Sequence, residues 1–204
     1  MQVIPASSPD ALTRAVSQLR AGGLVIHATE TCYGIACDLQ NPVAVRKLFH
    51  DKRRPDHQLV SALFASPEAA AEYVEISPKA RELMSAHLPG PLTLVLPRKT
   101  SARPLWLSLS GGGTDPMIGV RISNHPFAAQ LVQTFAGPIA TTSANMHGLP
   151  SPYTPEEILA QWKDTHSEAL LLDHGSLDIA PPSTVVQVVG SGLTVLRQGA
   201  LHVD

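Results

Sequence analysis

Short runs of hydrophobic residues alternate with amphipathic segments along the whole chain. The apolar runs at residues 24–26, 59–65, 92–96, 117–122, 138–140, 170–172 and 183–189 have the length of strands and are bounded by turn residues. Helical periodicity marks the segments between them; the first, which begins near residue 8, carries apolar residues at positions 12, 15, 16 and 19 on one face. Strands that alternate with helices, followed by a hairpin that turns at residues 190–192, predict one mixed-sheet α/β domain.

Five of the helical segments begin with the same signature, a small polar residue followed by proline. A side-chain oxygen at the first position accepts hydrogen bonds from free backbone N–H groups, and proline suits the first helical turn. The pairs are Ser8-Pro9, Asn41-Pro42, Ser66-Pro67, Ser77-Pro78 and Thr154-Pro155. We therefore predict that helices start at these pairs, and that a further helix follows His125-Pro126.

Residues 98–116 show neither a helical nor a strand period. They contain Pro104 and the run Gly111-Gly112-Gly113. Three glycines allow a close backbone approach to phosphate, but the run matches no phosphate-loop motif. We predict a mobile linker here.

The composition narrows the class of protein. With 204 residues, 44% of them hydrophobic, the chain has enough material for one domain with a substantial core, which we place over residues 1–204. A formal net charge of -2 argues against a surface coated with positive charge for general nucleic-acid binding, and is compatible with a local basic concavity. The two cysteines, Cys32 and Cys37, are too few for a disulfide framework or a zinc site, so we expect reduced thiols.

Neither a leader nor a membrane span is evident from the sequence. The N-terminal residues lack the charged start and long apolar run of a signal peptide, and no apolar segment approaches membrane-spanning length. We therefore expect a cytoplasmic protein that does not bind membranes.

Positive charge is concentrated in one segment of this mildly acidic chain. Five cationic residues fall at the end of the helix that starts at Asn41 and in the loop after it: Arg46, Lys47, Lys52, Arg53 and Arg54. Pro55 stiffens that loop because it biases the preceding residue towards an extended conformation. Arginine and lysine suit phosphate oxygens, but cations also match a helix C-terminus. The segment therefore predicts either a phosphate-binding loop or a solvated surface cluster.

Polar and cationic residues also follow several predicted strands. They are Thr29, Arg121, Ser143, Asn145, Ser183 and Arg197. Strand ends of an α/β sheet are where ligand sites tend to form. For Thr29 the alternative is a capped turn, and for Arg121 it is a structural salt bridge. No Walker loop, dinucleotide fingerprint or nucleophile elbow is present, so this set suits positioning and charge stabilisation of an anionic ligand more than covalent catalysis.

These residues occur in motifs that resemble the YrdC family over nearly the whole chain. Each motif is short, and their common order and spacing make the resemblance specific. They are Thr29-Glu30-Thr31-Cys32-Tyr33-Gly34, the Lys-x-Arg at Lys52 and Arg54, Leu88-Pro89-Gly90-Pro91-Leu92-Thr93-Leu94, Gly119-Val120-Arg121, Asn124-His125-Pro126, Ser143-Ala144-Asn145, Ser183-Thr184-Val185-Val186 and Arg197-Gln198-Gly199. The resemblance covers a single YrdC-like domain, without the additional C-terminal domain of longer relatives.

The resemblance implies a fold and a reaction. The fold would be α/β, a twisted mixed sheet with flanking helices and a concave basic face. The enzyme would be a nucleotidyltransferase that makes L-threonylcarbamoyladenylate from L-threonine, bicarbonate or CO2, and ATP, with release of pyrophosphate, for threonylcarbamoyladenosine modification of tRNA. Mg²⁺ is expected on the phosphates, held mainly by phosphate oxygens and water, so we nominate no metal ligand. The partners would be the tRNA threonylcarbamoyl-transfer machinery, and weak direct binding of tRNA fits the same picture.

The resemblance also implies roles for particular residues. Threonine would be held by Thr29, Arg121, Ser143 and Ser183. ATP would be held by Lys52, Arg54, Asn145 and Arg197, with Gln58 and Tyr153 at further nucleotide positions. The catalytic set would be Lys52, Arg54, Ser143 and Asn145. The chain departs from the family pattern at Ala28, Leu59, Leu63, His147 and Gln187.

Three alternatives to this function stay open at the level of sequence. A diverged paralogue would act on another substrate, and a carbamoyl-transfer relative would act on a protein partner. An RNA-binding module of the same fold would use the basic concavity without chemistry. The low positive charge and the 4% share of aromatic residues count against the RNA-binding module, because base-stacking platforms need aromatic side chains.

Overall fold

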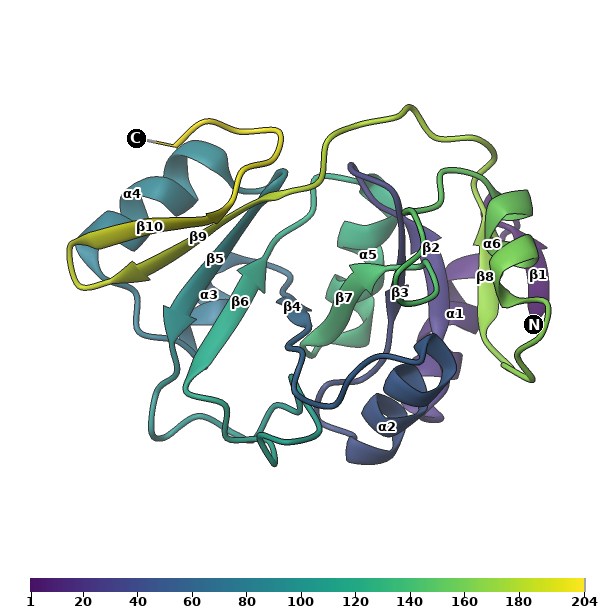
Figure 1. Ribbon diagram of the computed structural model, residues 1–204, viewed down its shortest axis with the longest axis horizontal. Helices are drawn as coiled ribbons and strands as arrows, with labels where there is room; N and C mark the ends of the chain where they lie inside the picture. Colours follow the sequence, from purple (N-terminus) through teal and green to yellow (C-terminus); the bar gives the residue numbers. More distant parts are fainter. Residues whose placement is uncertain (204) are drawn as a thin grey trace.

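The computed structural model describes residues 1–203 and contains one mixed sheet of ten strands (Figure 1). The strand order is β1-β8-β2-β3-β7-β4-β6-β5-β9-β10. The strands are β1 (Gln2–Pro5), β2 (Val25–Ala28), β3 (Tyr33–Ala36), β4 (Ser61–Leu63), β5 (Leu92–Pro97), β6 (Met117–Arg121), β7 (Ile139–Ser143), β8 (Leu170–Asp173), β9 (Thr184–Val189) and β10 (Gly192–Arg197). The helices are α1 (Ala11–Arg20), α2 (Pro42–Lys52), α3 (Pro67–Ala71), α4 (Pro78–His87), α5 (Pro126–Phe135) and α6 (Pro155–Trp162). The predicted α/β class with a mixed sheet is confirmed.

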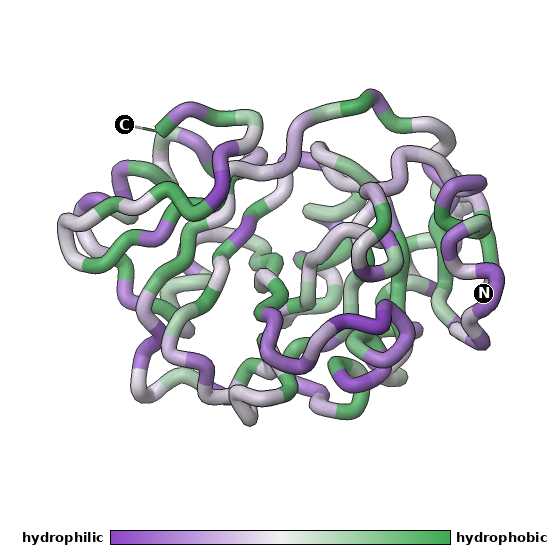
Figure 2. The backbone as a smooth tube through the Cα atoms, viewed as in Figure 1, coloured by the Kyte–Doolittle hydropathy of each residue, from purple (hydrophilic) through white to green (hydrophobic). Residues whose placement is uncertain are grey.

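Alternate residues of the central strands bury against different helices. Val25 of β2 belongs to the cluster formed with α1 and α5, whereas Ile26 belongs to the larger cluster that includes Leu48 and Phe49 of α2. Successive side chains of a strand point to opposite faces, so a strand buried on both faces reads as a continuous apolar run. In Figure 2 the central strands are accordingly hydrophobic, while the segment that follows α2 is hydrophilic.

Local capping signals place four of the five predicted helix starts. The side chains of Asn41, Ser66, Ser77 and Thr154 each accept a hydrogen bond from a backbone N–H of the first turn. Ser8 is the exception, and its prediction is wrong: α1 starts at Ala11 with Asp10 at its N-cap, without a side-chain cap bond. The backbone N–H of Ser8 instead donates to the carbonyl of Pro5 in a turn that follows β1. That turn delays the helix.

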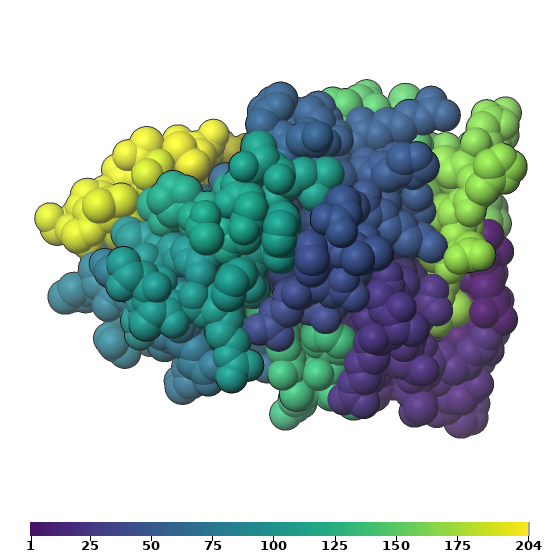
Figure 3. All heavy atoms as spheres, turned by 90° about the horizontal axis from the view of Figure 1, so that it is seen from below, coloured from purple at the N-terminus to yellow at the C-terminus, as the bar shows by residue number. Residues whose placement is uncertain are grey.

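The segment 98–116 is packed against the body of the protein, so the prediction of a linker is wrong. Leu105 and Leu107 are buried, and the carbonyl of Leu107 accepts from the N–H of Val60 at 2.8 Å. The Arg98 guanidinium donates to three carbonyls within the segment, at Ala102, Arg103 and Gly113. From below, Figure 3 shows this segment beside α2, where both form part of one surface. Side-chain packing therefore orders the segment, although no periodic pattern in its sequence predicts this packing.

Two strands were not predicted, and one predicted strand is shorter than expected. β1 lies at one end of the strand order and pairs with β8 in parallel, and β3 pairs with β2 and β7 antiparallel. β3 consists of four buried residues and shows no alternation of polar and apolar side chains. The apolar run 59–65 contributes only Ser61–Leu63 to the sheet. The predicted C-terminal hairpin is confirmed as β9 and β10, with Gly190 at a φ of 60° in its turn.

Candidate active site

A cavity of about 390 Å³ lies over the middle of the sheet, where β4, β6 and β7 meet β5, β9 and the turn after β2. Eight of its lining residues carry hydroxyl groups, and three arginines reach it: Arg54, Arg121 and Arg197. No aspartate or glutamate stands among the lining residues that the structure describes. A hollow with guanidinium groups, hydroxyl groups and no carboxylate on its wall favours an anionic ligand.

Arg121 enters the cavity from the end of β6 and is held by the turn between β2 and β3. Its Nη2 donates to Glu30 Oε1 at 2.5 Å and to Thr31 Oγ1 at 2.9 Å. The second carboxylate oxygen of Glu30 accepts from Ser123 Oγ. Burial by itself raises the pKa of Glu30, but the Arg121 charge and the hydrogen bonds from Ser123 and Arg121 outweigh burial and lower it. Glu30 is therefore an anion paired with Arg121, which matches the salt bridge that the sequence left open.

Lys52 ends α2 and is buried under the end of β7. Its Nζ donates to the carbonyl of Ser143 at 2.5 Å and to the carbonyl of Asn145. Burial, and then the nearby charge of Arg54, lower the pKa of Lys52 to about 7. The side-chain hydroxyl of Ser143 donates to Asn145 Oδ1. The Lys-x-Arg and Ser-x-Asn motifs thus meet in space, although about ninety residues separate them along the chain.

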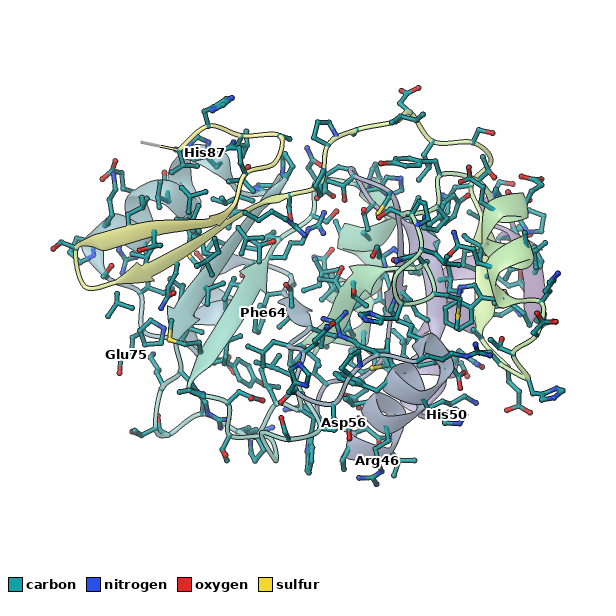
Figure 4. The ribbon with its side chains drawn as sticks, in the orientation of Figure 1. Arg46, His50, Asp56, Phe64, Glu75 and His87 are labelled. Atoms are coloured by element: carbon teal, nitrogen blue, oxygen red, sulfur yellow. The ribbon has the colours of Figure 1, made fainter. Side chains whose placement is uncertain are left out.

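Arg54 lies in the loop after α2 and lines the cavity. Its Nη2 donates to the carbonyl of Leu59 at 2.6 Å, and its guanidinium carbon lies 5.8 Å from the ring centroid of Phe49. By contrast, Arg53 adopts a left-handed conformation (φ 52°), and its side chain is exposed. Arg46 and His50 also point away from the molecule (Figure 4). The basic segment is therefore divided: Lys52 and Arg54 lie on the inner side, Arg46 and Arg53 are in solvent, and Lys47 pairs with Glu168.

The opposite wall of the cavity comes from the C-terminal hairpin. The Nε and Nη2 atoms of Arg197 donate to the carbonyl of Ser183, and Nη2 also reaches Ser183 Oγ at 3.0 Å. Ser183 Oγ lies 3.0 Å from Thr93 Oγ1 of β5. Burial lowers the pKa of Arg197 and that of Arg54. These contacts fix the Arg197 side chain on the rim of the cavity.

The structure brings most of the predicted site residues together. Arg54, Arg121, Ser143, Ser183 and Arg197 line the cavity, and Lys52 and Asn145 contact its wall at Ser143. Three others do not line it. Thr29 Oγ1 donates to the carbonyl of Cys32, and the Tyr153 hydroxyl donates to the Ala180 carbonyl. The backbone carbonyl of Gln58 accepts from Arg54 Nε. For Thr29 this is the capped turn that the sequence offered as the alternative.

Several lining residues were not singled out by the sequence. They are Thr31, Cys32, Ser61, Thr93, Gly119 and Ser151. Four of them belong to the motifs that resemble the YrdC family: Thr31, Cys32, Thr93 and Gly119. The motifs did not indicate which of their residues face the cavity. Ser61 stands in none of these motifs, and only the pairing of β4 with β7 places it beside Thr141.

Neither a metal cluster nor a membrane helix is found in the described part of the chain. Across residues 1–203 no three His, Cys, Asp or Glu side chains are arranged to hold a metal ion. Among the helices within the same range, none combines the length and apolarity needed to cross a membrane.

The comparisons with known proteins agree on one family. The model of the Sua5/YciO/YrdC family, whose description reads "Telomere recombination", matches residues 17–199. A threonylcarbamoyl-AMP synthase of Photobacterium profundum is 35% identical over 193 residues, which cover 93% of this chain and all of that protein. A threonylcarbamoyl-AMP synthase of Halorhodospira halophila is 37% identical over 158 residues, 77% of this chain and 78% of its own length.

Solved structures give the same result for the fold. The H234A/Y235A variant of P. abyssi Sua5 superimposes with a TM-score of 0.86 at 30% identity, over 98% of this chain and 60% of its own. A P. abyssi Sua5 structure complexed with L-threonine superimposes with a TM-score of 0.81 at 30% identity, over 93% of this chain and 54% of its own. The present chain thus spans little more than half the length of these two Sua5 structures. E. coli YciO, at 21% identity and a TM-score of 0.79, shares the fold over 97% of this chain.

Proposed function

The chain belongs to the Sua5/YciO/YrdC family, and from this premise we propose that it is a threonylcarbamoyl-AMP synthase. The reaction joins L-threonine, bicarbonate or CO2, and ATP, and releases pyrophosphate. One observation carries the proposal beyond family membership: three arginines and the Lys52–Ser143–Asn145 contacts converge on one cavity without a lining carboxylate. Both ATP and threonine bring anionic groups that such a cavity accommodates.

The geometry supports a division of the cavity between the two substrates. Arg121, with Thr31 beside it, offers guanidinium and hydroxyl donors that suit the threonine carboxylate. Ser143 and Ser183 line the same cavity and complete the amino-acid side in this proposal. Thr29 acts on this side through its turn, since its hydroxyl lies 3.1 Å from Thr31 Oγ1 and also accepts the Thr31 N–H.

The nucleotide side is assigned to Lys52, Arg54, Asn145 and Arg197. Lys52 and Arg54 come from the end of α2 and the loop after it, and Arg197 from β10 on the opposite wall. Charges on two walls neutralise the triphosphate and align its α-phosphorus. Gln58 and Tyr153 are placed at the periphery of this side, because neither lines the cavity.

The chemistry needs positioning more than a protein nucleophile. The threonine amine attacks CO2 and loses a proton, which forms an N–C bond and a carbamate. A carbamate oxygen then attacks the α-phosphorus of ATP. The bond between this phosphorus and the oxygen that bridges the α- and β-phosphates breaks, and pyrophosphate leaves. Cationic side chains neutralise the charge that develops on pyrophosphate. The lining offers hydroxyl oxygens and no carboxylate, so a Mg²⁺ ion that accompanies ATP would be held by phosphate oxygens and water.

Class, location and partners complete the proposal. The enzyme is a nucleotidyltransferase of the cytoplasm, and its product passes to the machinery that transfers the threonylcarbamoyl group to tRNA. The departures at Ala28, Leu59, Leu63 and His147 bear on which amino acid is used. Leu59 lines the cavity, whereas Ala28 and Leu63 are buried in the sheet and His147 is exposed. Leu59 is therefore the departure that contacts substrate in this proposal.

Pyrophosphate release from ATP is expected to require both L-threonine and bicarbonate, and to proceed without tRNA. The physical reason is that both small substrates supply atoms of the nucleophile, while no step needs RNA. The measurement is a coupled pyrophosphate assay with single omissions and with serine, valine and glycine in place of threonine. Release with another amino acid alone would favour the diverged paralogue, and tRNA binding without ATP turnover would favour the RNA-binding module.

Substitution of Arg54 by lysine is expected to lower the kcat/KM for ATP by about tenfold, although the charge is kept. A lysine lacks the planar fork that contacts the Leu59 carbonyl and packs over Phe49 while it faces phosphate. Arg53→Lys is the matched control, because that side chain is exposed, and exposed charges contribute about 0–1 kcal/mol. Equal and near-normal kinetics in both variants would show that the loop is a solvated surface cluster.

A further inference from the structure

The contacts around Arg121 connect two parts of the sheet that are not adjacent. Strands β7 and β4 lie between β3 and β6 in the strand order. Glu30 nevertheless bridges from the turn between β2 and β3 to the end of β6, since one of its oxygens accepts from Arg121 and the other from Ser123. The side chains of Glu30 and Arg121 are each only 11% exposed, so solvent screens this pair weakly.

The bridge leaves Nη1 of the Arg121 guanidinium for a ligand, because no contact in the described part of the chain engages this atom and it is not enclosed. Nη2 is occupied by Glu30 Oε1 and Thr31 Oγ1. The Nε atom of the same guanidinium is buried and has no partner. An unsatisfied charged donor is costly inside a protein unless something else completes it. Nε is enclosed, but Arg121 lines the cavity and its Nη1 is not enclosed, so a carboxylate in the cavity can accept from Nη1 and offset part of this cost.

We infer that Glu30 is a positioning residue, which holds the Arg121 guanidinium in the orientation that receives the carboxylate of the amino-acid substrate. The inference rests on the proposed function for the identity of that substrate. Ser123 supports the role because it fixes the second oxygen of Glu30, and Ser123 is itself fixed when its hydroxyl accepts the His125 N–H at 3.1 Å. The positioning therefore depends on the length of the Glu30 side chain, which lets its two oxygens accept from Arg121 and Ser123 at the same time, and not on its negative charge alone.

The effect of the Glu30 charge can be separated from the effect of its side-chain length, because the two predict opposite orders of damage for Glu30→Asp and Glu30→Gln. A carboxylate near Arg121 repels the substrate carboxylate, and its simple neutralisation would therefore strengthen substrate binding. Glu30→Asp keeps the charge but is one methylene shorter, so it cannot contact Arg121 and Ser123 together. Glu30→Gln keeps the length and an acceptor oxygen but removes the charge. If Glu30 positions Arg121, Glu30→Asp is the more damaging of the two.

The test is steady-state kinetics of pyrophosphate release with threonine and ATP varied in turn. For Glu30→Asp we expect the KM for threonine to rise about tenfold and the KM for ATP to stay within about twofold of the wild type. The rise for Glu30→Gln is expected to be smaller. Glu168→Gln is the control, since it neutralises an ion pair with Lys47 in which the Glu168 side chain is 85% exposed. A silent Glu30→Asp, or equal rises in both KM values, would overturn the inference.

A second readout does not depend on the proposed function. Two hydrogen bonds on Nη2 hinder rotation of the guanidinium, so ¹⁵N-labelled wild-type protein should give separate Nη signals for Arg121, assigned by comparison with Arg121→Lys. In Glu30→Asp these signals should merge as rotation becomes fast. Merged signals in the wild type would overturn the positioning role. An inactive wild type with separate signals would instead contradict the proposed function and leave Arg121 held as described.

Discussion

Substitution of Lys52 by methionine is expected to lower the kcat/KM of pyrophosphate release by about a hundredfold. Methionine nearly matches the length of lysine but donates no hydrogen bond, so the carbonyls of Ser143 and Asn145 lose their buried partner. The segment from the end of β7 to Asn145, which carries both side chains of the Ser-x-Asn motif, then loses its side-chain connection to α2. The measurement is the kinetics of the purified variant, at a temperature at which circular dichroism shows it folded.

Lys47→Met provides the matched control for this experiment. Lys47 lies on the same helix, five residues before Lys52, and its Nζ is 3.3 Å from the exposed carboxylate of Glu168. An exposed pair of this kind contributes about 0–1 kcal/mol to stability, and it lies outside the cavity. We expect near-normal kinetics for Lys47→Met. A similar loss in both variants would mean that the charge of the helix, and not the position of Lys52, supports activity.

The second large effect is expected on stability in mild acid, and it centres on His27. This imidazole is fully buried in β2, and its Nδ1 lies 2.9 Å from the Ala28 carbonyl. Burial lowers the pKa of His27 to about 4, and the His174, His125 and Arg121 charges that face it act in the same direction, against the Ala28 hydrogen bond. The rings of His125 and His174 pack edge to face at 5.3 Å. Protonation of His27 would therefore place a cation in a buried cluster that already contains an arginine.

The sign of the pH effect follows from the two pKa values of His27. An imidazole in the unfolded chain titrates near pH 6.5, so between pH 6.5 and 4 the unfolded state binds a proton that the folded state does not. The contribution of His27 to the free energy of unfolding should thus be fully present above pH 6.5. It should decrease by about 3 kcal/mol as the pH decreases to 4. His27→Asn keeps a donor near the Ala28 carbonyl but cannot be protonated in this range.

Urea unfolding of both proteins at a series of pH values between 7.5 and 4 tests this prediction. We expect His27→Asn to be less stable than the wild type at pH 7.5, with a difference that shrinks as the pH falls. His147→Asn is the control, because that side chain is exposed. Parallel pH profiles for the wild type and His27→Asn would show that other groups, such as the Glu30–Arg121 pair, govern the acid dependence.

The sequence by itself determined the local features of this protein. Asn41, Ser66, Ser77 and Thr154 cap their helices through backbone groups two or three residues away, so the capping signal and its effect lie within one turn. The apolar runs of the central strands and the C-terminal hairpin were predictable for the same reason. Motif order also pointed to the family and to most of the residues that meet at the cavity, while their individual roles stay predictions.

Only the tertiary structure decided which members of each motif face the cavity and which groups they contact. Thr31 lines the cavity whereas Thr29 caps the turn beneath it, because the β2–β3 turn is oriented by long-range pairing with β7 and β8. Lys52 contacts carbonyls 91 and 93 residues away, and Arg121 pairs with a carboxylate 91 residues away. Segment 98–116 is ordered by buried contacts of Leu105 and Leu107 with no periodic signal. Each of these outcomes depends on strand order and burial, which arise when distant segments pack together, and no local pattern encodes them.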